Sequence, residues 1–375
     1  MIENYLTIKG GEDMTRRERF ERSLKLMEVD KLPHGEQMIH DELLAKMTGE
    51  HFHNDHENAL SKWMKELLPE ENFQRHKAVR EMLNFDWVHL FPIEPMVETM
   101  SDDGTIKVQK DIWGQTLKIT SESYEIIERA IKSLDELKKY KFPNVEDFLY
   151  SDIERWAKES DFWVTTQIDT GFFKASQLIG FEEFIDYMYD NPTELKDFME
   201  RFTEFQKKLI DRLVSTGTNS IWFSDDHAFN NGPFLSPEQL KEYDFDFTKQ
   251  LVSHTHSKGL LANFHSCGNI EKTLPLIIET GVSSLHAIQP SAGNDIYKYK
   301  KEYGRDICFI GNFDMDYLMP KGSVKEIDAK VKEMVSIMWE KERTGYILST
   351  CNMLNNDQPV ENALMLHLSA EKYGR

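Results

Sequence analysis

Strand-like and helix-like segments alternate regularly from about residue 160 to the end of the chain. Short apolar runs that finish in polar clusters are separated by helices with clear start signals: NPTE at 191–194, SPEQ at 236–239 and SVKE at 323–326. Glycines mark the ends of these helices, at Gly217, Gly259 and Gly345. This alternation predicts an α/β fold built on a parallel sheet.

Eight segments of the chain are candidate strands. They are Lys31–Glu36, Phe85–Phe91, Phe162–Asp169, Ser220–Asp226, Leu260–His265, Ser283–Ile288, Ile307–Gly311 and Tyr346–Thr350. The first is the weakest, because proline at position 33 has no backbone N–H to donate. Neither G-x-G-x-x-G nor G-x-x-x-x-G-K-[ST] occurs to support a nucleotide-binding doubly wound sheet. Eight strands favour a closed (β/α)8 barrel, a TIM barrel.

The rest of the chain is assigned around this barrel. Residues 1–13 lack a hydrophobic period and are expected to be a flexible extension. Residues 14–375 are then a single barrel domain. Within it, the charged range 37–83 is predicted to be an N-terminal helical insertion, and 104–118 a β-hairpin insertion with its turn near Asp111.

Charge and cysteine content limit the classes of function. With 45 Lys+Arg against 65 Asp+Glu the formal net charge is −20, which argues against binding to nucleic acid or anionic membranes. No apolar run approaches the length that spans a bilayer. Three cysteines and no recognisable signal peptide indicate a reducing cytoplasm rather than a disulfide framework. A cysteine with a chemical role is therefore expected to be a ligand or a nucleophile.

Two of the three cysteines stand at candidate strand ends. His265 and Cys267 flank one serine, so alternation along an extended chain can point both side chains to the same side. Cys351 follows the last strand. One imidazole and two thiolates form a set that holds zinc with one position left open. Two simpler alternatives stay open, since cysteines often fill core space and a thiol can act as a nucleophile. Cys308 lies within an apolar strand and is expected to be structural.

Polar residues also gather at the predicted carboxyl ends of strands. Asp225, Asp226 and His227 follow one strand and are candidate catalytic residues, although a solvated loop would contain the same residue types. A second set, near other strand ends, is expected to bind or orient a substrate: Glu36, Asp169, Gln289 and Asn312. Aromatic side chains near the same rim would suit an aromatic ligand or would pack in the core: Phe172, Phe173, Trp222, Phe229 and Phe234.

Several stretches together resemble the uroporphyrinogen decarboxylase superfamily, from Met14 to near the end of the chain. They are TRRERFERSLKLMEVDKLPHGE, GTIKVQKDIWGQ, FSDDHAFNNGPFLSPEQLKEY, HSCGNI and QPSAGNDIYKYKKEYGRDICFIGNFD. The resemblance implies a (β/α)8 barrel. The decarboxylase branch carries an arginine-rich signature that grips the carboxylates of its tetrapyrrole, whereas residues 31–46 here read KLPHGEQMIHDELLAK, without arginine. We therefore do not expect decarboxylation.

The methyltransferase branch of that superfamily is the better match. The resemblance implies zinc on His265, Cys267 and Cys351, and transfer of a methyl group between a small substrate and the cobalt of a corrinoid. The chain has no D-x-H-x-x-G stretch that would bind a corrinoid, so a separate carrier protein is expected to supply it. The aromatic residues favour an aryl methyl ether or other O-methyl compound as the donor of a methyl group to cobalt. Transfer in the opposite direction, from methyl-cobalt to a thiol acceptor, is the other possibility. A metal-free lyase and a non-catalytic barrel that docks the carrier are the alternatives.

In this interpretation the acidic residues and one histidine have provisional roles. Asp225, Asp226 and Glu36 are candidates for a fourth resting ligand or for proton transfer. His227 is a candidate acid, because the ordinary pKa of an imidazole lies near neutral pH.

Overall fold

The centre of the molecule is a seven-stranded parallel sheet in the order β1-β6-β7-β10-β11-β12-β13, seen in a computed structural model that describes residues 14–49, 67–120 and 124–375. The strands are β1 (Trp87–Leu90), β6 (Trp163–Asp169), β7 (Ser220–Ser224), β10 (Leu261–Ser266), β11 (Ser284–Ala287), β12 (Cys308–Ile310) and β13 (Tyr346–Ile347). All seven overlap predicted strand ranges. The predicted extension, residues 1–13, lies outside the described residues.

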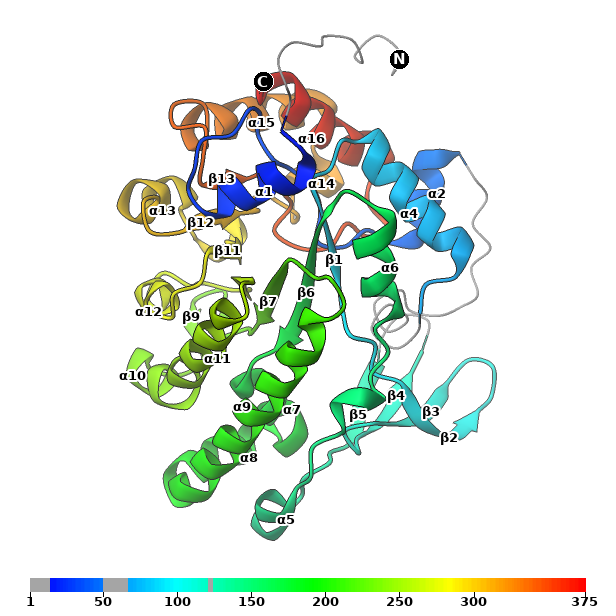
Figure 1. Cartoon of the computed structure of the whole chain (residues 1–375), viewed down its shortest axis with the longest axis vertical. Helices are drawn as coiled ribbons and strands as arrows, with labels where there is room; N and C mark the ends of the chain where they lie inside the picture. The colour runs from blue at the N-terminus through cyan, green and yellow to red at the C-terminus, as the bar shows by residue number, and fades with distance from the viewer. Residues whose placement is uncertain (1–13, 50–66, 121–123) are drawn as a thin grey trace.

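Helices cover the outside of this curved sheet (Figure 1). They are α1 (Arg16–Leu24), α2 (Asp41–Thr48), α4 (Glu70–Met82), α5 (Leu134–Lys139), α6 (Ser151–Glu159), α7 (Gly171–Ile179), α8 (Phe181–Asp190), α9 (Pro192–Val214), α10 (Pro237–Leu240), α11 (Asp246–Ser257), α12 (Leu274–Glu279), α13 (Ile296–Tyr303), α14 (Leu318–Lys321), α15 (Val324–Met338) and α16 (Val360–Tyr373). Among the described residues, no helix has both the length and the apolar character needed to cross a membrane. The strands are buried along almost their whole length, as parallel strands covered by helices must be.

The eighth predicted strand, Lys31–Glu36, is not a strand. Among the described residues the central sheet therefore has seven strands in place of the eight of the predicted closed (β/α)8 barrel, and we call this curved, barrel-like sheet the barrel. His34 forms one isolated parallel bridge to Leu348, and its carbonyl accepts a hydrogen bond from the backbone N–H of Asp86, just before β1. The segment thus joins the two edges of the sheet through single hydrogen bonds. Pro33 explains the irregularity, because it accepts from Leu348 through its carbonyl but has no N–H to continue a ladder.

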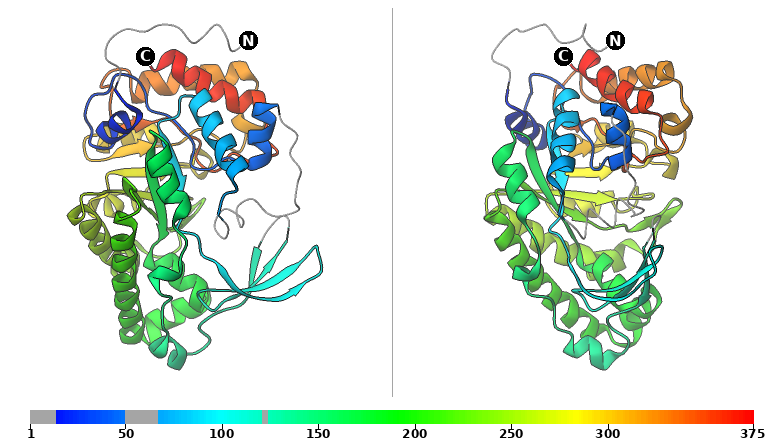
Figure 2. Two further views of the ribbon diagram at one scale, coloured as in Figure 1. Left: turned by 45° about the vertical axis from the view of Figure 1, so that its right-hand side comes forward. Right: turned by 90° about the vertical axis from the view of Figure 1, so that its right-hand side faces the viewer.

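The range 104–118 contains two strands of a larger antiparallel sheet that projects from the side of the barrel (Figure 2). The sheet has four strands: β2 (Met96–Asp102), β3 (Lys107–Asp111), β4 (Thr116–Ile119) and β5 (Tyr124–Glu128). Asp111 closes the β3–β4 turn, because its carboxylate accepts from the backbone N–H groups of Trp113 and Gln115. Of the predicted helical range 37–83, residues 50–66 lie outside the described part, and α2 and α4 occupy most of the remainder.

The predicted helix starts are mostly confirmed at the level of individual hydrogen bonds. Ser236 and Ser323 both form complete capping boxes. Asn191 precedes α9 but makes no side-chain cap, so Pro192 at the first helical position is the start signal that remains. The helix after Ser236 is interrupted by a π-helical turn, Lys241–Phe245, that the sequence did not reveal.

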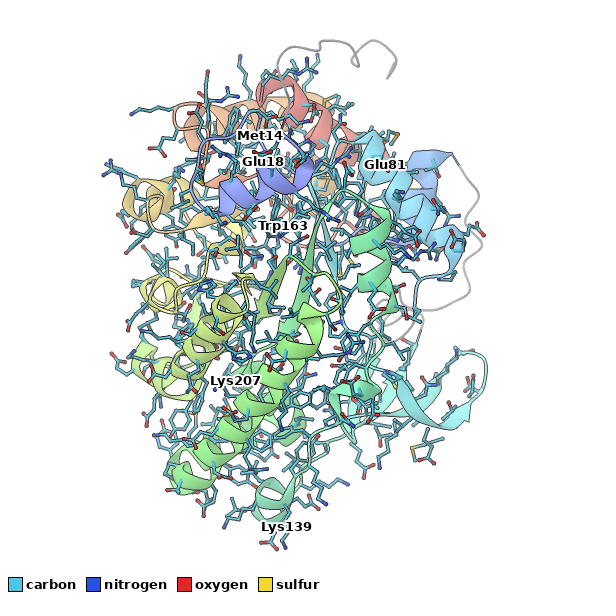
Figure 3. The ribbon with its side chains drawn as sticks, viewed as in Figure 1. Met14, Glu18, Glu81, Lys139, Trp163 and Lys207 are labelled. Carbon is cyan, nitrogen blue, oxygen red and sulfur yellow. The ribbon has the colours of Figure 1, made fainter. Side chains whose placement is uncertain are left out.

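An aromatic cluster closes the amino-terminal end of the barrel. Phe20 of α1 packs against Trp87 and Trp163, with ring centroids 5.6 and 5.8 Å apart, and Trp163 is labelled beside α1 in Figure 3. Trp222 stacks on Trp87 at 5.4 Å inside the barrel. Because this end is filled, a site within the barrel has to open at the carboxyl ends of the strands.

The chain turns sharply after β10. Gly268 has φ +77°, and a Cβ at this position would lie 2.1 Å from the carbonyl oxygen of Ala228. A glycine is therefore needed for the backbone conformation and also for the close approach of the segment that follows β7.

We predict that Glu371 of α16 stabilises the irregular segment in a pH-dependent way. Burial alone would raise the pKa of Glu371, but the hydrogen bond from His34 and the charges of His34 and Lys31 lower it from 4.5 to about 2. A lowered carboxylate pKa contributes stability that is complete above the unfolded-state pKa and is lost as the pH falls toward 2. Urea unfolding of Glu371→Gln should show a loss of up to about 3 kcal/mol at pH 7. A difference from wild type that does not shrink between pH 5 and pH 2 would contradict this role.

We also predict that Gly268→Ala is far more damaging than a matched control. Gly259 has nearly the same φ, +79°, yet a Cβ at that position would meet no atom within 4 Å. Gly259→Ala should cost roughly 1–2 kcal/mol for the left-handed backbone alone. Gly268→Ala should cost about 1–3 kcal/mol more, because of the contact with Ala228. Equal losses in chemical unfolding of the two variants would show that the close approach is unimportant.

Candidate metal centre

Three side chains that can bind a metal meet at the carboxyl end of β10. His265 Nε2 lies 3.5 Å from Cys267 Sγ and 3.8 Å from Oδ1 of Asp226, which follows β7. The donor atoms of these three residues all lie within 4.8 Å of one another. Asp226 also accepts a hydrogen bond of 2.8 Å from the backbone N–H of Cys267. The predicted pair His265 and Cys267 therefore does face one side, joined by a carboxylate.

The chemistry of this set suits a zinc ion. Tetrahedral zinc with ordinary Zn–N and Zn–S bonds holds its nitrogen and sulfur ligands about 3.5 Å apart, as His265 and Cys267 are here. Burial lowers the pKa of His265, which keeps the imidazole neutral. Burial, with the charge of Asp226 adding to it, raises the pKa of the Cys267 thiol. A bound cation would reverse this last effect, because it stabilises the thiolate.

Cys351 lies at the same end of the barrel but outside that 4.8 Å group. It follows the segment after β13, where its backbone N–H donates to Phe313, and its side chain is buried. Burial raises the pKa of its thiol to about 12. Its neighbour Asn352 places its side-chain amide 3.9 Å from Cys267 Sγ, and the charge of Cys351 contributes to the raised pKa of Cys267. Cys351 is thus near the donors without completing the set in this arrangement.

A cavity of about 220 Å³ opens beside His265 and Cys267. Its apolar wall consists of Met38, Phe91, Leu117, Ile126 and Phe173, and its polar lining includes Gln37, Glu94, Asp111, Gln115, Gln167, Asp169, Lys174, Gln177, Asp226 and Asn352. Lys174 is buried and pairs with Asp169 at 2.8 Å and Glu94 at 3.5 Å. Burial opposes its charge, but these carboxylates outweigh that effect and raise its pKa. None of the described lining residues is an arginine.

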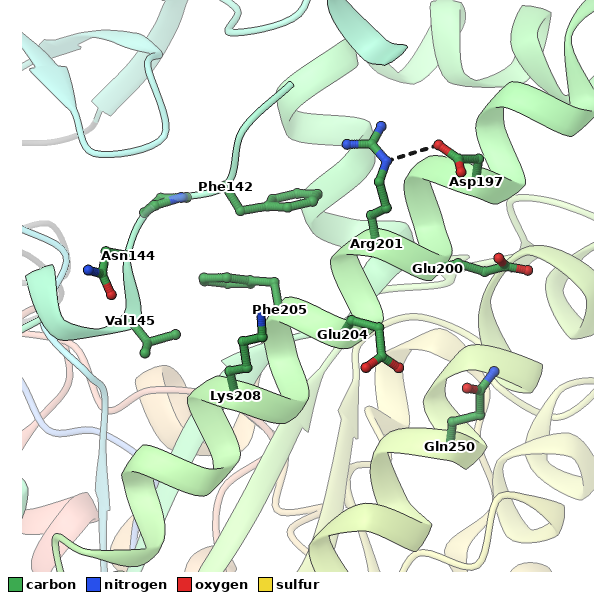
Figure 4. A pocket seen from close by; sticks show the side chains of 11 residues that line it. Phe142, Asn144, Val145, Asp197, Glu200, Arg201, Glu204, Phe205, Lys208 and Gln250 are labelled. Carbon is green, nitrogen blue, oxygen red and sulfur yellow. Dashed lines mark hydrogen bonds and ion pairs between the residues drawn. The ribbon is translucent and has the colours of Figure 1, made fainter. Parts of the chain in front are cut away.

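A larger groove, of about 780 Å³, lies away from these donors (Figure 4). It is bordered by Phe142 and by residues of α9, where Asp197 and Arg201 form an ion pair of 2.9 Å. Neither His265 nor Cys267 lines it. The smaller cavity is therefore the candidate site, because it is lined by the metal-binding side chains His265, Cys267 and Asp226.

Asp225 and His227 form a closed cluster behind the cavity instead of facing it. His227 Nε2 lies 2.8 Å from Asp244 and 3.5 Å from Asp225, and all three side chains are fully buried. Burial disfavours a charged imidazole, but the two carboxylates raise the pKa of His227 to about 10. Burial also raises the pKa of Asp225. Of the three predicted catalytic residues, Asp226 alone lines the cavity.

The predicted substrate-binding residues divide in the same way. Asp169 lines the cavity. The other three hold backbone segments: Glu36 accepts from Thr350 N–H at 3.2 Å, Gln289 accepts from Gly268 N–H at 3.3 Å, and Asn312 donates to the carbonyl of Ile288 at 2.5 Å. None of these three is among the described residues that line the cavity.

The aromatic rim expected from the sequence does not form around the cavity. Phe172 and Trp222 are buried in the core, and Phe229 and Phe234 contact each other away from the cavity lining. Phe173 alone of the five lines the cavity, together with Phe91 and Tyr124, which no sequence signal identified. Four of the five residues on which an aromatic substrate was predicted therefore lie outside the cavity lining.

Several residues of the site escaped sequence reasoning. Gln167 precedes Asp169 by two positions on β6, and that spacing could have placed both on one face. Asn352 follows Cys351 directly. Gln37 and Lys174 gave no local signal, because the tertiary fold alone brings a loop and α7 to this cavity.

Comparisons with known proteins agree with this architecture. The family profile described as uroporphyrinogen decarboxylase (URO-D) matches residues 104–373. A methylated-thiol–coenzyme M methyltransferase of Methanosarcina mazei is 20% identical over 166 residues, which are 44% of this chain and 42% of that protein. The match thus spans less than half of that relative's length.

Solved structures show the likeness in fold. A methyltransferase from Methanosarcina mazei has a TM-score of 0.72 and 17% identity, over 96% of this chain and 99% of that one. An L-ribulose 3-epimerase reaches a TM-score of 0.45 at 12% identity, over 90% of this chain and 95% of its own, too low to carry an argument. With the profile match covering most of its length, the chain belongs to the uroporphyrinogen decarboxylase (URO-D) family.

Proposed function

We propose that this protein is a zinc-dependent methyltransferase that moves a methyl group between a small substrate and the cobalt of a corrinoid on a separate carrier protein. The observation that carries the proposal is the meeting of His265, Cys267 and Asp226 beside a small cavity at the carboxyl end of the barrel. The methyltransferase relatives of the chain support the reaction class.

His265 and Cys267 would hold the zinc ion, and Cys351 and Asp226 are the candidates for the remaining ligand. Zinc, when bound, acts as a Lewis acid that lowers the pKa of a thiol or polarises an ether or alcohol oxygen. Two cysteine thiolates would balance the charge of the ion, which permits a partly buried site. If Asp226 rather than Cys351 is the third ligand, the charge balance is the same.

The other residues of the cavity would bind and position the substrate. Met38, Phe91, Leu117 and Phe173 exclude water from one wall. Asp226 is 41% exposed and lies beside the donor atoms, so its carboxylate would receive the proton that a thiol releases. Asp225 and Glu36, the other carboxylates that the sequence offered for this role, are fully buried outside the cavity lining.

A small thiol is the substrate class we favour, in place of the aryl methyl ether expected from the sequence. Of the five aromatic residues on which the aryl substrate was predicted, Phe173 alone lines the cavity. A cavity of about 220 Å³ suits a small molecule. The name of the Methanosarcina mazei relative supports sulfur chemistry in the family.

Decarboxylation of a porphyrinogen has no support in this cavity. A substrate with eight carboxylates needs several cationic partners. Lys174 is the single lysine or arginine among the described lining residues, and it is already paired with Asp169. Asp226, Asp169 and Glu94 add negative charge to the cavity.

Zinc analysis of cysteine variants tests the metal site. We expect wild type to bind about one zinc per chain, and Cys267→Ser to lose most of the zinc and the methyl transfer while it remains folded. Cys308→Ala is the matched control, because Cys308 is buried in β12, outside the cavity lining. The zinc content of Cys351→Ser and of Asp226→Asn then shows which of these two residues is the third zinc ligand. Full activity of a zinc-free Cys267→Ser protein would contradict the mechanism.

Methyl-transfer assays with methylcobalamin as a soluble substitute for the carrier test the substrate class. We expect small thiols to accept the methyl group and to be consumed in proportion to demethylated cobalamin. Methoxylated aromatic compounds, offered with reduced cobalamin, should give rates lower by at least about tenfold. The opposite order of rates would restore the aryl ether hypothesis. Carrier binding without turnover of any donor or acceptor would favour a docking protein without catalysis.

A further inference from the structure

His265 belongs to a chain of hydrogen bonds that crosses three strand ends. Its Nδ1 lies 2.7 Å from Nδ1 of His286 on β11. Nε2 of His286 lies 3.0 Å from the backbone carbonyl oxygen of Thr350, the residue before Cys351. The chain therefore runs from the loop after β13, through β11, to the metal-binding candidate on β10.

The carbonyl of Thr350 determines which atom donates in each hydrogen bond of this chain. A carbonyl oxygen can only accept a hydrogen bond, so Nε2 of His286 must carry a proton. His286 is fully buried, and its ring lies 5.2 Å from Trp222 and 5.0 Å from His265, an environment that disfavours a second proton and a charge. A neutral imidazole has one N–H, which leaves Nδ1 of His286 as an acceptor.

The same rule then determines the state of His265. Its Nδ1 must donate the proton shared across the 2.7 Å contact, because two lone pairs cannot face each other at that distance. Its Nε2 is consequently unprotonated and directed toward Cys267 and Asp226. This is the state that a metal ion requires of a neutral histidine ligand.

We propose that His286 is a positioning residue that selects the tautomer of His265 and so prepares Nε2 for the metal. The role of His286 in metal binding rests on the proposed zinc site. The tautomer of His265 depends only on the hydrogen bonds of the metal-free protein. His286 is not among the described residues that line the cavity, so it would act on a bound metal only through His265.

Glu36 has a place at the start of this chain. Its carboxylate accepts from the backbone N–H of Thr350 at 3.2 Å and from the hydroxyl groups of Thr350 and Ser349. These bonds hold the Thr350 peptide, whose carbonyl then faces His286. The fully buried carboxylate of Glu36, outside the cavity lining, is thereby linked to the candidate ligand His265 on β10 through Thr350 and His286.

Nitrogen NMR of the metal-free protein with labelled histidine tests the tautomer directly. We expect His265, assigned by its loss in His265→Gln, to show the pattern of an imidazole protonated at Nδ1 near neutral pH. Replacement His286→Leu should return His265 to a proton on Nε2 or to a mixture of the two forms. Observation of the Nε2-protonated form in wild type would overturn the proposal.

Zinc affinity gives an independent measurement with a matched pair of variants. In His286→Gln the amide offers an oxygen that accepts and an NH2 group that donates, so it can fill both roles of the imidazole, whereas His286→Leu can fill neither. We expect the Leu variant to bind zinc about 10–100-fold more weakly than wild type, and the Gln variant to recover most of that loss. Melting curves of the metal-free proteins check that both variants fold.

The possible results separate this proposal from the proposed function. Equal zinc affinity in wild type and a folded His286→Leu protein would overturn the role of His286. If His286→Leu does not fold, the NMR of wild type decides. Wild type that binds no zinc but carries the proton of His265 on Nδ1 would refute the zinc enzyme and support the hydrogen-bond chain.

Discussion

The register of the parallel strands determines the whole site. Asp169 pairs with Ser224, Ser224 with His265, and His265 with His286, so that β6, β7, β10 and β11 present one continuous row of residues. A slip of one residue in β10 would turn His265 away from the cavity and leave a buried polar side chain without its partner on β11. The metal donors and their supporting hydrogen bonds therefore depend on the same ladder that holds the barrel together.

Patterns confined to one stretch of the chain were sufficient for the scaffold and for half of the candidate metal centre. Seven strands follow from apolar runs bounded by capped helices, and the pair His265 and Cys267 follows from their spacing at a strand end. The segment around Pro33 failed as a strand because one missing N–H breaks a ladder. Asp225 and His227 looked catalytic because nothing nearby in the sequence announces Asp244. Its carboxylate, on a π-helical turn 17 residues beyond His227, pairs with the His227 imidazole in a buried cluster.

Polar residues at strand ends serve two purposes that the sequence cannot separate. Asp169 and Asp226 face the cavity, whereas Glu36, Gln289 and Asn312 accept from or donate to backbone groups of neighbouring loops. Both groups were predicted from the same kind of position, at or just after the end of a candidate strand. Loops that leave a parallel sheet carry unpaired backbone groups, and a donor atom fixed to such a loop needs these side chains to keep its position. Glu36, Gln289 and Asn312 thus support the site, although they do not line the cavity.

The cavity is shared between the barrel and the separate sheet β2–β5. Strand ends of the barrel supply Asp169 and His265, while the sheet supplies Leu117, Tyr124 and Ile126. A volume of about 220 Å³ is below the range of about 300–1,000 Å³ that encloses drug-sized ligands. In the proposed reaction a corrinoid ring must therefore remain at the mouth while the small substrate lies inside. In this reaction the β2–β5 sheet would border the small substrate through Leu117, Tyr124 and Ile126, although none of the described metal-binding candidates belongs to it.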